Sequence, residues 1–202
     1  MKILRLLAVA ALGLGAACTQ APSKTAPAAA QPAAPAKQIT AEQACKDPHI
    51  QCLDQPIDIS LRMPDGQTFT ETLPPPNPLL QYGNIYLFPG LTLYIEADVD
   101  GDRLVNLLMV PGNVHPEKTL VLTFEQRETQ GQDGMFLSVH NPFARWLKYH
   151  AAIADVDTEA GMLKKSTTCP VIPGSNASEN WPQPVIQLVL SDFHLLTQDS
   201  KE

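Results

Sequence analysis

The sequence predicts a mainly β protein, an antiparallel two-sheet sandwich with one short N-terminal helix. Three features predict it: hydrophobic and polar residues alternate in short segments, turn-forming residues separate these segments, and helical periodicity is almost absent. Antiparallel strands that have one buried and one solvated face show this alternation. An immunoglobulin-like arrangement is one form of such a sandwich. A closed barrel is the alternative that the same pattern allows.

The helix is expected at the start of the folded domain, because Thr40 and Gln43 have the spacing of a capping box. It should cover residues 41–46, and the period changes to two after it. The prolines from Pro74 to Pro78 are expected to end a strand and to lie outside any central strand. Nine strands are expected, at residues 57–63, 67–73, 85–88, 91–99, 103–110, 119–125, 135–141, 147–154 and 185–196.

The clearest hairpin turns at Asp100-Gly101, which is a preferred residue pair for a two-residue turn. This turn predicts Leu108 opposite Leu93 on the core face. The same register predicts Arg103 opposite Asp98 on the solvent face.

Residues 135–141 and 147–154 are expected to pair as a second hairpin, which would bring His140 and His150 together on its outer face. Two histidines at that separation could chelate a transition metal. Lys148 stands beside them, however, and its ammonium group repels a cation. We therefore interpret these residues as a solvated polar face.

The aspartates of residues 98–102 are the other candidate for a cation site, because alternating carboxylates can converge on calcium. An EF-hand loop needs a glutamate six residues after its glycine, and that position is Leu107. A hairpin turn accounts for the same residues. Neither a metal nor another cofactor is therefore predicted.

The first eighteen residues have the form of a signal peptide. Lys2 and Arg5 precede an apolar run from Leu6 to Ala17 that is too short to span a bilayer as a mature helix. The run ends in Leu14-Gly15-Ala16-Ala17-Cys18, which resembles the lipobox of bacterial lipoproteins. In that family the cysteine is diacylated, the peptide is cut before it, and the new N-terminus is usually acylated as well.

The resemblance implies that Cys18 anchors the protein in a membrane of the bacterial envelope through acyl chains such as palmitate, and two or three chains anchor stably. Thr19 follows the cysteine where an aspartate would indicate retention in the inner membrane. We therefore expect an outer-membrane lipid anchor with the domain facing the periplasm. An ordinary signal peptide cut near Ala17 is the alternative.

The chain is expected to have three parts: a signal peptide at 1–17, the lipidated cysteine with a tether at 18–39, and the sandwich domain at 40–202. Residues 19–37 contain eight Ala and four Pro but no aromatic or large aliphatic residue, so they cannot form a core. Their prolines favour extended segments that reach about 50 Å when stretched.

Three cysteines remain in the domain once Cys18 is lipidated, and an odd count in an oxidising compartment leaves one thiol unpaired. Cys45 and Cys52 enclose a short loop that contains Asp47-Pro48, which favours a local disulfide. A bridge from either of them to Cys169 is the alternative. Cys169 has no histidine beside it that would activate a nucleophile, so we interpret it as structural or disulfide-bonded.

The connection between Ala154 and Val185 is about thirty residues long, far beyond the usual length, and long connections are often functional. It contains the binding candidates Lys164, Lys165 and Trp181. Trp181 has two interpretations. It is either an exposed interface anchor or a ring that covers the open end of the sandwich.

The charge of the domain limits its partners. Residues 40–202 carry 10 Lys and Arg against 21 Asp and Glu, a net charge of −11. Such a surface repels phosphate backbones, which argues against nucleic acid. Motifs of serine hydrolases, zinc peptidases, phosphate loops and dinucleotide sites are absent, so no catalytic residue is predicted.

The sequence therefore predicts a non-enzymatic binding or structural module of the cell envelope that contacts an envelope protein. The alternative is a periplasmic immunity or inhibitor protein. An acidic domain of this kind would be steered electrostatically to a cationic wall hydrolase.

Overall fold

The computed structural model describes residues 39–129, 131–156 and 162–197. The signal segment, Cys18 and the expected tether lie outside these residues. The elements in chain order are α1 (Ala41–Ala44), β1 (Ile50–Leu53), β2 (Ile57–Arg62), β3 (Thr68–Leu73), β4 (Asn77–Gln81), β5 (Asn84–Leu87), β6 (Leu91–Asp100), β7 (Arg103–Val110), β8 (Thr119–Thr129), β9 (Gln132–His140), β10 (Trp146–Asp155), β11 (Lys164–Ser166), β12 (Asn176–Trp181) and β13 (Val185–Leu196).

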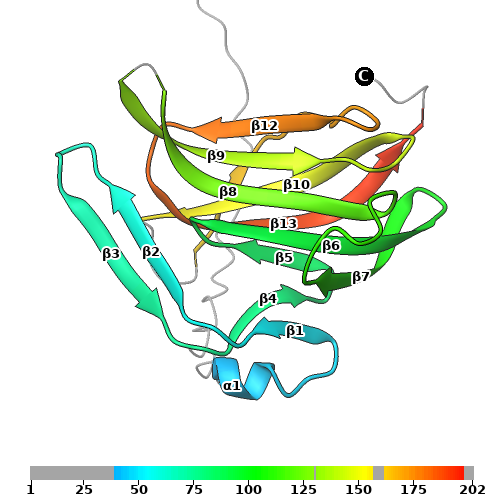
Figure 1. Cartoon of the computed structure of the whole chain (residues 1–202), viewed down its shortest axis with the longest axis horizontal. Helices are drawn as coiled ribbons and strands as arrows, with labels where there is room; N and C mark the ends of the chain where they lie inside the picture. The colour runs from blue at the N-terminus through cyan, green and yellow to red at the C-terminus, as the bar shows by residue number, and fades with distance from the viewer. Residues whose placement is uncertain (1–38, 130, 157–161, 198–202) are drawn as a thin grey trace, which may run out of the picture. The chain divides into compact units, whose positions relative to one another are not determined.

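The strands form two facing antiparallel layers, which confirms the predicted sandwich (Figure 1). One layer has the order β7-β6-β8-β9-β12, and the other has the order β1-β4-β5-β13-β10-β11. His194 of β13 pairs with Arg103 of β7, which joins the two layers into one eleven-stranded sheet. β2 and β3 form a separate two-stranded sheet.

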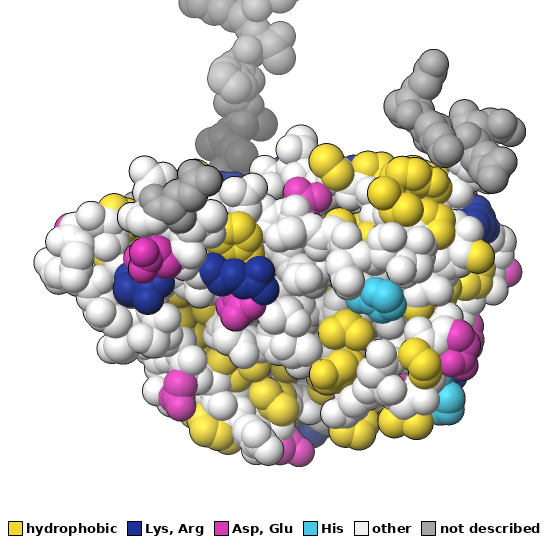
Figure 2. All heavy atoms as spheres, turned by 45° about the horizontal axis from the view of Figure 1, so that its top comes forward, with side chains coloured by type: hydrophobic (Ala, Val, Ile, Leu, Met, Phe, Trp, Pro, Cys, Tyr) yellow, Lys and Arg dark blue, Asp and Glu magenta, His cyan; other side chains and the backbone are white. Residues whose placement is uncertain are grey.

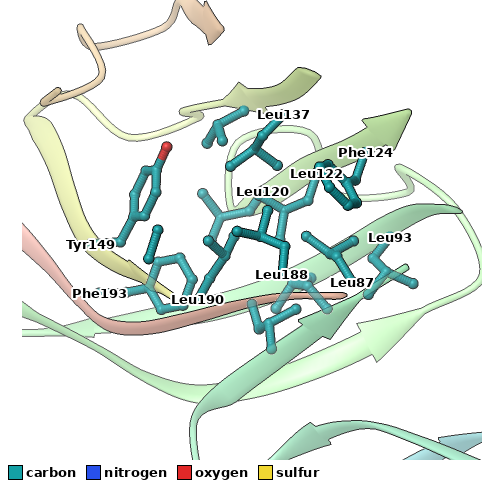
Figure 3. Close-up of a cluster of buried hydrophobic side chains, with 14 of the residues drawn as sticks. Leu87, Leu93, Leu120, Leu122, Phe124, Leu137, Tyr149, Leu188, Leu190 and Phe193 are labelled. Atoms are coloured by element: carbon teal, nitrogen blue, oxygen red, sulfur yellow. The ribbon is translucent and has the colours of Figure 1, made fainter. Parts of the chain in front are cut away.

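The hydrophobic core lies between the two layers. Leu120, Leu122 and Phe124 of β8 point toward Leu188 and Leu190 of β13 (Figure 3), and none of the five has exposed surface. In β8 these residues alternate with outward-facing ones, so the period of two in the sequence specifies which face is buried. Burial of each such side chain contributes about 1.5–3 kcal/mol relative to exposure.

The β2–β3 hairpin lies at the left end of the sandwich in Figure 1. Ile57, Ile59 and Leu61 of β2 are at most 3% exposed and belong to the core. The residues between them are exposed. The hairpin is therefore attached by one face of β2, while its other face remains in solvent.

β6 and β7 pair in a different register from the one expected. Asp100 pairs with Arg103, so the turn falls one residue later than predicted. A bulge at Asn106, which has a φ of 51°, adds one residue to β7. An extra residue turns the following side chains to the opposite face, and Leu108 is accordingly 49% exposed. Asp98 accepts a hydrogen bond from Asn106 at 3.1 Å and does not pair with Arg103.

The predicted hairpin of β9 and β10 is wrong. β9 pairs with β8 and β12 in one layer, whereas β10 pairs with β13 and β11 in the other. The chain crosses between layers at residues 141–145. His140 and His150 therefore do not lie together: His140 is 3.1 Å from Asn176, and His150 is 3.6 Å from Asp192.

Four strands were not predicted, namely β1, β4, β11 and β12. Pro78 lies inside β4, between β1 and β5, against the expectation for a proline. It pairs with Cys52 beside a register shift, and β5 pairs with β4 only from Leu80 onward. A proline is tolerated there because the ladder is irregular on one side and absent on the other.

The expected capping box and local disulfide are confirmed. Gln43 N–H donates to Thr40 Oγ1 at 3.3 Å, and Thr40 N–H donates to Gln43 Oε1 at 3.1 Å. Cys45 and Cys52 form a disulfide that ties the end of α1 to β1. Cys169 is a free, exposed thiol, so the long-range bridge is excluded.

Candidate functional site

Two hollows of about 420 Å³ each open beside the β2–β3 hairpin and meet at Arg62 and Gln126. Together we call them the hairpin groove. Three segments that are distant in sequence build the first hollow: the β2–β3 turn, the β8–β9 tip and the loop before β13, which lie at the same end of Figure 1. Besides the two shared residues, the first hollow is lined by Met63, Pro64, Gly66, Gly131, Gln132, Asp133, Gly134, Pro182, Gln183 and Pro184, and the second by Asp58, Ser60, Pro89, Gly90 and Glu125.

The groove exists because the β8–β9 hairpin extends beyond its neighbours. β6 pairs with β8 only as far as Phe124, and β12 pairs with β9 only as far as Met135. Pro182 and Pro184 follow β12 directly, and their missing N–H groups prevent them from continuing its ladder. The last described residues of the β8–β9 hairpin therefore project as a two-stranded ribbon whose edges pair with no other described strand.

Gln126 connects this ribbon to β2. Its side-chain Oε1 accepts the Arg62 N–H at 2.7 Å, and its Nε2 donates to the Arg62 carbonyl at 2.8 Å. These are the two bonds that a residue of a neighbouring antiparallel strand would make. The amide of Gln126 therefore takes the place of a peptide group at the edge of β2.

An ion pair lies across the first hollow. Arg62 Nε is 2.9 and 2.8 Å from the two carboxylate oxygens of Asp133, and Nη2 also contacts this carboxylate. The hydrogen bonds from Arg62 hold the pKa of Asp133 below its ordinary value, and the same bonds raise the pKa of Arg62. Both groups are consequently charged over the whole physiological range, and they fix the distance between the two hairpins.

The two hairpins are acidic. Figure 2 shows positive and negative side chains next to one another over the left end of the face it presents. Asp133 pairs with Arg62, and Glu125 pairs with Arg127. The Arg127 guanidinium also lies over the ring of Phe136, 5.7 Å from its centre. Acids outnumber bases here by six to two: Asp58, Asp65, Glu71, Glu125, Glu128 and Asp133 against Arg62 and Arg127.

Trp181 is not an exposed anchor. It is 7% exposed, its ring meets that of Phe124 edge to face at 6.2 Å between centres, and it donates to Ser166 Oγ. It therefore closes the sandwich, which was one of the two interpretations of the sequence. The segment that contains it still contributes to the site, because Pro182, Gln183 and Pro184 line the groove.

No protein-family model, curated protein or solved structure matches this chain.

The other sequence candidates lie outside the groove. Lys164 donates to Asp155 at 2.7 Å, and Lys165 is exposed on the same short strand, β11. Cys169 is exposed, and its N–H donates to Glu179. None of these residues lines either hollow.

Two further features are absent from the described residues. No group of three or more His, Cys, Asp or Glu there is arranged to hold a metal ion. No helix in residues 39–129, 131–156 and 162–197 has the length and the hydropathy to cross a membrane.

Sequence reasoning did not identify Arg62, Gln126 or Asp133 as site residues. Arg62 contacts Gln126, which is 64 positions away, and Asp133, which is 71 positions away. No local sequence pattern encodes contacts over that range. One signal was available, since Pro182 and Pro184 predict the end of a strand and hence an unpaired edge beside it.

Proposed function

We propose that this protein is a lipid-anchored, non-enzymatic binding module of the bacterial outer membrane that presents the hairpin groove to a partner in the periplasm. The residues from Leu14 to Cys18 support the anchor through their resemblance to a lipobox. The Ala- and Pro-rich residues 19–37 support a tether that lets the domain reach away from the lipid.

The composition of the groove carries the proposal for binding. Its first hollow is lined by amide side chains, glycines, prolines and one ion pair. Its carboxylate, Asp133, is engaged by Arg62, so neither group is poised to transfer a proton. Amides and unpaired backbone groups recognise a ligand through hydrogen bonds without changing it.

A second candidate function is inhibition of a cationic wall hydrolase. The net charge of −11 on residues 40–202 and the excess of acids on the two hairpins favour this class. Electrostatic steering of this kind accelerates association and weakens with salt. Binding of a basic muramidase that disappears at high ionic strength, together with loss of its activity, would select this candidate.

The anchor is tested by maturation in living cells. Globomycin should block processing, and Cys18→Ser should release the protein from the membrane fraction. Normal processing with globomycin present would contradict the lipoprotein assignment.

The binding site is tested by photocrosslinking in intact cells. A photoreactive amino acid at Gln132, which is exposed in the groove, should capture a partner. The same amino acid at Val114, which is 69% exposed on a different loop, is the control. Equal capture from the two positions, or capture from Val114 alone, would contradict a binding role for the groove.

A further inference from the structure

We infer that the free edge of β2 accepts an extended polypeptide segment rich in lysine or arginine as an added strand. The inference rests on the proposed function, because it names the class of ligand that the hairpin groove binds. In strand addition, main-chain hydrogen bonds to an exposed edge supply affinity and the side chains supply specificity.

The directions of the backbone groups in β2 follow from bonds at its end. Arg62 directs its N–H and C=O away from β3, because both bind Gln126. Met63 directs its N–H across the hairpin, where it donates to the carbonyl of Gln67 at 2.8 Å. Successive residues of an antiparallel strand point to opposite sides. Ser60 and Asp58 therefore direct their N–H and C=O groups away from β3, into the second hollow that they line.

This edge of β2 pairs with no strand that the structure describes. Among the described residues β2 pairs only with β3. The stretch from Asp58 to Arg62 is about 13 Å of strand, and Gln126 occupies only its last position. A bound peptide would make with Asp58 and Ser60 the same pair of backbone hydrogen bonds that Gln126 makes with Arg62.

The hollow has room for a backbone. Its opposite wall is formed by Pro89, Gly90 and Glu125, and it encloses about 420 Å³. A Cβ atom placed on Gly90 would meet nothing within 4 Å. A main chain that lies about 4.8 Å from β2, the usual spacing between paired strands, therefore has open space on its Gly90 side.

The charges select a basic segment. Asp58 and Glu125 both line the second hollow, and the two hairpins carry six acids against two arginines. Both arginines are already paired, Arg62 with Asp133 and Arg127 with Glu125. An incoming lysine or arginine therefore meets net negative charge, whereas an acidic segment would be repelled.

The probe is a blocked synthetic peptide of alternating valine and lysine, titrated into the full chain in detergent by calorimetry. It should bind, and binding should weaken as salt is added. The counterpart with glutamate in place of lysine should not bind. Methylation of the valine amides and methylation of the lysine amides should differ, because only one set faces β2 in an extended peptide. Equal binding of the acidic peptide, or equal effects of the two methylations, would overturn the inference.

Matched proline variants locate the edge. Ser60→Pro removes an N–H that faces the hollow, and Thr70→Pro removes one from its partner on the outer edge of the same hairpin. Ser60→Pro should weaken binding of the lysine peptide roughly tenfold or more, and Thr70→Pro should leave its affinity unchanged. Unchanged binding by Ser60→Pro would overturn the inference.

Hydrogen exchange in the wild-type chain tests the same edge without depending on whether the proline variants fold. Saturating lysine peptide should slow exchange of the Ser60 amide and leave that of Thr70 unaffected. Binding without protection of Ser60 would place the peptide elsewhere and overturn the inference. The proposed function is judged separately, since crosslinking from Gln132 requires no assumption about the ligand.

Discussion

Trp181 donates its indole N–H to Ser166 Oγ at 2.9 Å, which ties β12 in one layer to β11 in the other. Neither strand was expected from the sequence, yet the contact between them closes the sandwich on this side. The contact stands directly before the prolines that line the hairpin groove. The contact between β11 and β12 therefore positions one wall of the candidate site.

Trp181→Ala should destabilise the fold by roughly 3–5 kcal/mol, because it removes a large buried ring. Ser166→Ala removes only the hydrogen-bond acceptor and should cost about 1 kcal/mol. Urea unfolding followed by circular dichroism measures both. A fully stable Trp181→Ala that had lost a captured partner would instead support the interface interpretation.

Local patterns predicted the elements of this fold better than their partners. The alternation in β8 and the capping box at Thr40 depend on residues a few positions apart, and the structure confirms both. The predicted β6–β7 register was wrong because the turn falls one residue later than expected and the bulge at Asn106 then shifts the pairing again. The alternation of hydrophobic residues does not reveal which strand lies beside which.

The candidate site illustrates the same limit. Arg62 belongs to a strand that was predicted, but its contacts with Gln126 and Asp133 arise only when two hairpins meet at one end of the sandwich. Such contacts depend on topology. Strand order is decided by long-range packing, which a single sequence does not display.

Asn141 anchors the crossover between the two layers. It has no exposed surface, and its Nδ2 donates to the carbonyls of Arg145 at 2.9 Å and Val171 at 3.0 Å. Its Oδ1 accepts the N–H of Phe143 at 3.0 Å. Nδ2 also donates to the carbonyl of Ile172 at 3.3 Å, so a single side chain binds four backbone groups at this crossover.

Asn141→Ala should lower the free energy of unfolding by about 1–3 kcal/mol, because it leaves buried backbone groups unpaired. Asn141→Asp should cost more, since it replaces the donor with an acceptor that faces three carbonyls. Chemical denaturation compares the two. Asn180→Asp, on the exposed face of β12, is the control and should change stability by less than about 0.5 kcal/mol. Equal stability of Asn141→Asp and the control would contradict this role.

Glu96 holds the loop before β8. Its carboxylate is 2.7 Å from Lys118 Nζ and 2.6 Å from His115 Nδ1. Hydrogen bonds from Lys118 and then His115 lower the pKa of Glu96 below its ordinary value of 4.5. A carboxyl with a lower pKa in the folded state adds stability above its unfolded pKa and loses it as the pH falls through the folded value.

The melting temperature of Glu96→Gln should therefore be lower than that of the wild type near neutral pH. The difference should shrink as the pH falls below 4.5, the ordinary pKa. Differential scanning calorimetry across this pH range measures the difference in melting temperature. The contributions of the other acidic residues are the same in both proteins and therefore cancel. A difference that is constant with pH would show that the charge of Glu96 does not contribute.

Tyr149 of β10 has a fully buried hydroxyl with no hydrogen-bond partner among the described residues. Its ring packs against Phe193 with 5.8 Å between centres (Figure 3). Burial raises the pKa of Tyr149 above its usual value of 10, and the charges of Glu179 and Cys169 raise it further. The folded state therefore keeps the proton at a pH where the unfolded chain loses it.

Tyr149→Phe keeps the ring contacts and removes the unpaired hydroxyl, so its stability at neutral pH should equal or exceed that of the wild type by up to about 1–2 kcal/mol. A pKa raised by folding makes stability fall as the pH rises above the unfolded value, which here is 10. Unfolding experiments above that pH should show a steeper loss for the wild type than for Tyr149→Phe. The half-buried Tyr94 supplies the control, because Tyr94→Phe leaves Tyr149 in place and should keep the steep loss. A Tyr149→Phe variant that was markedly less stable at neutral pH would mean that the hydroxyl has a partner in solution.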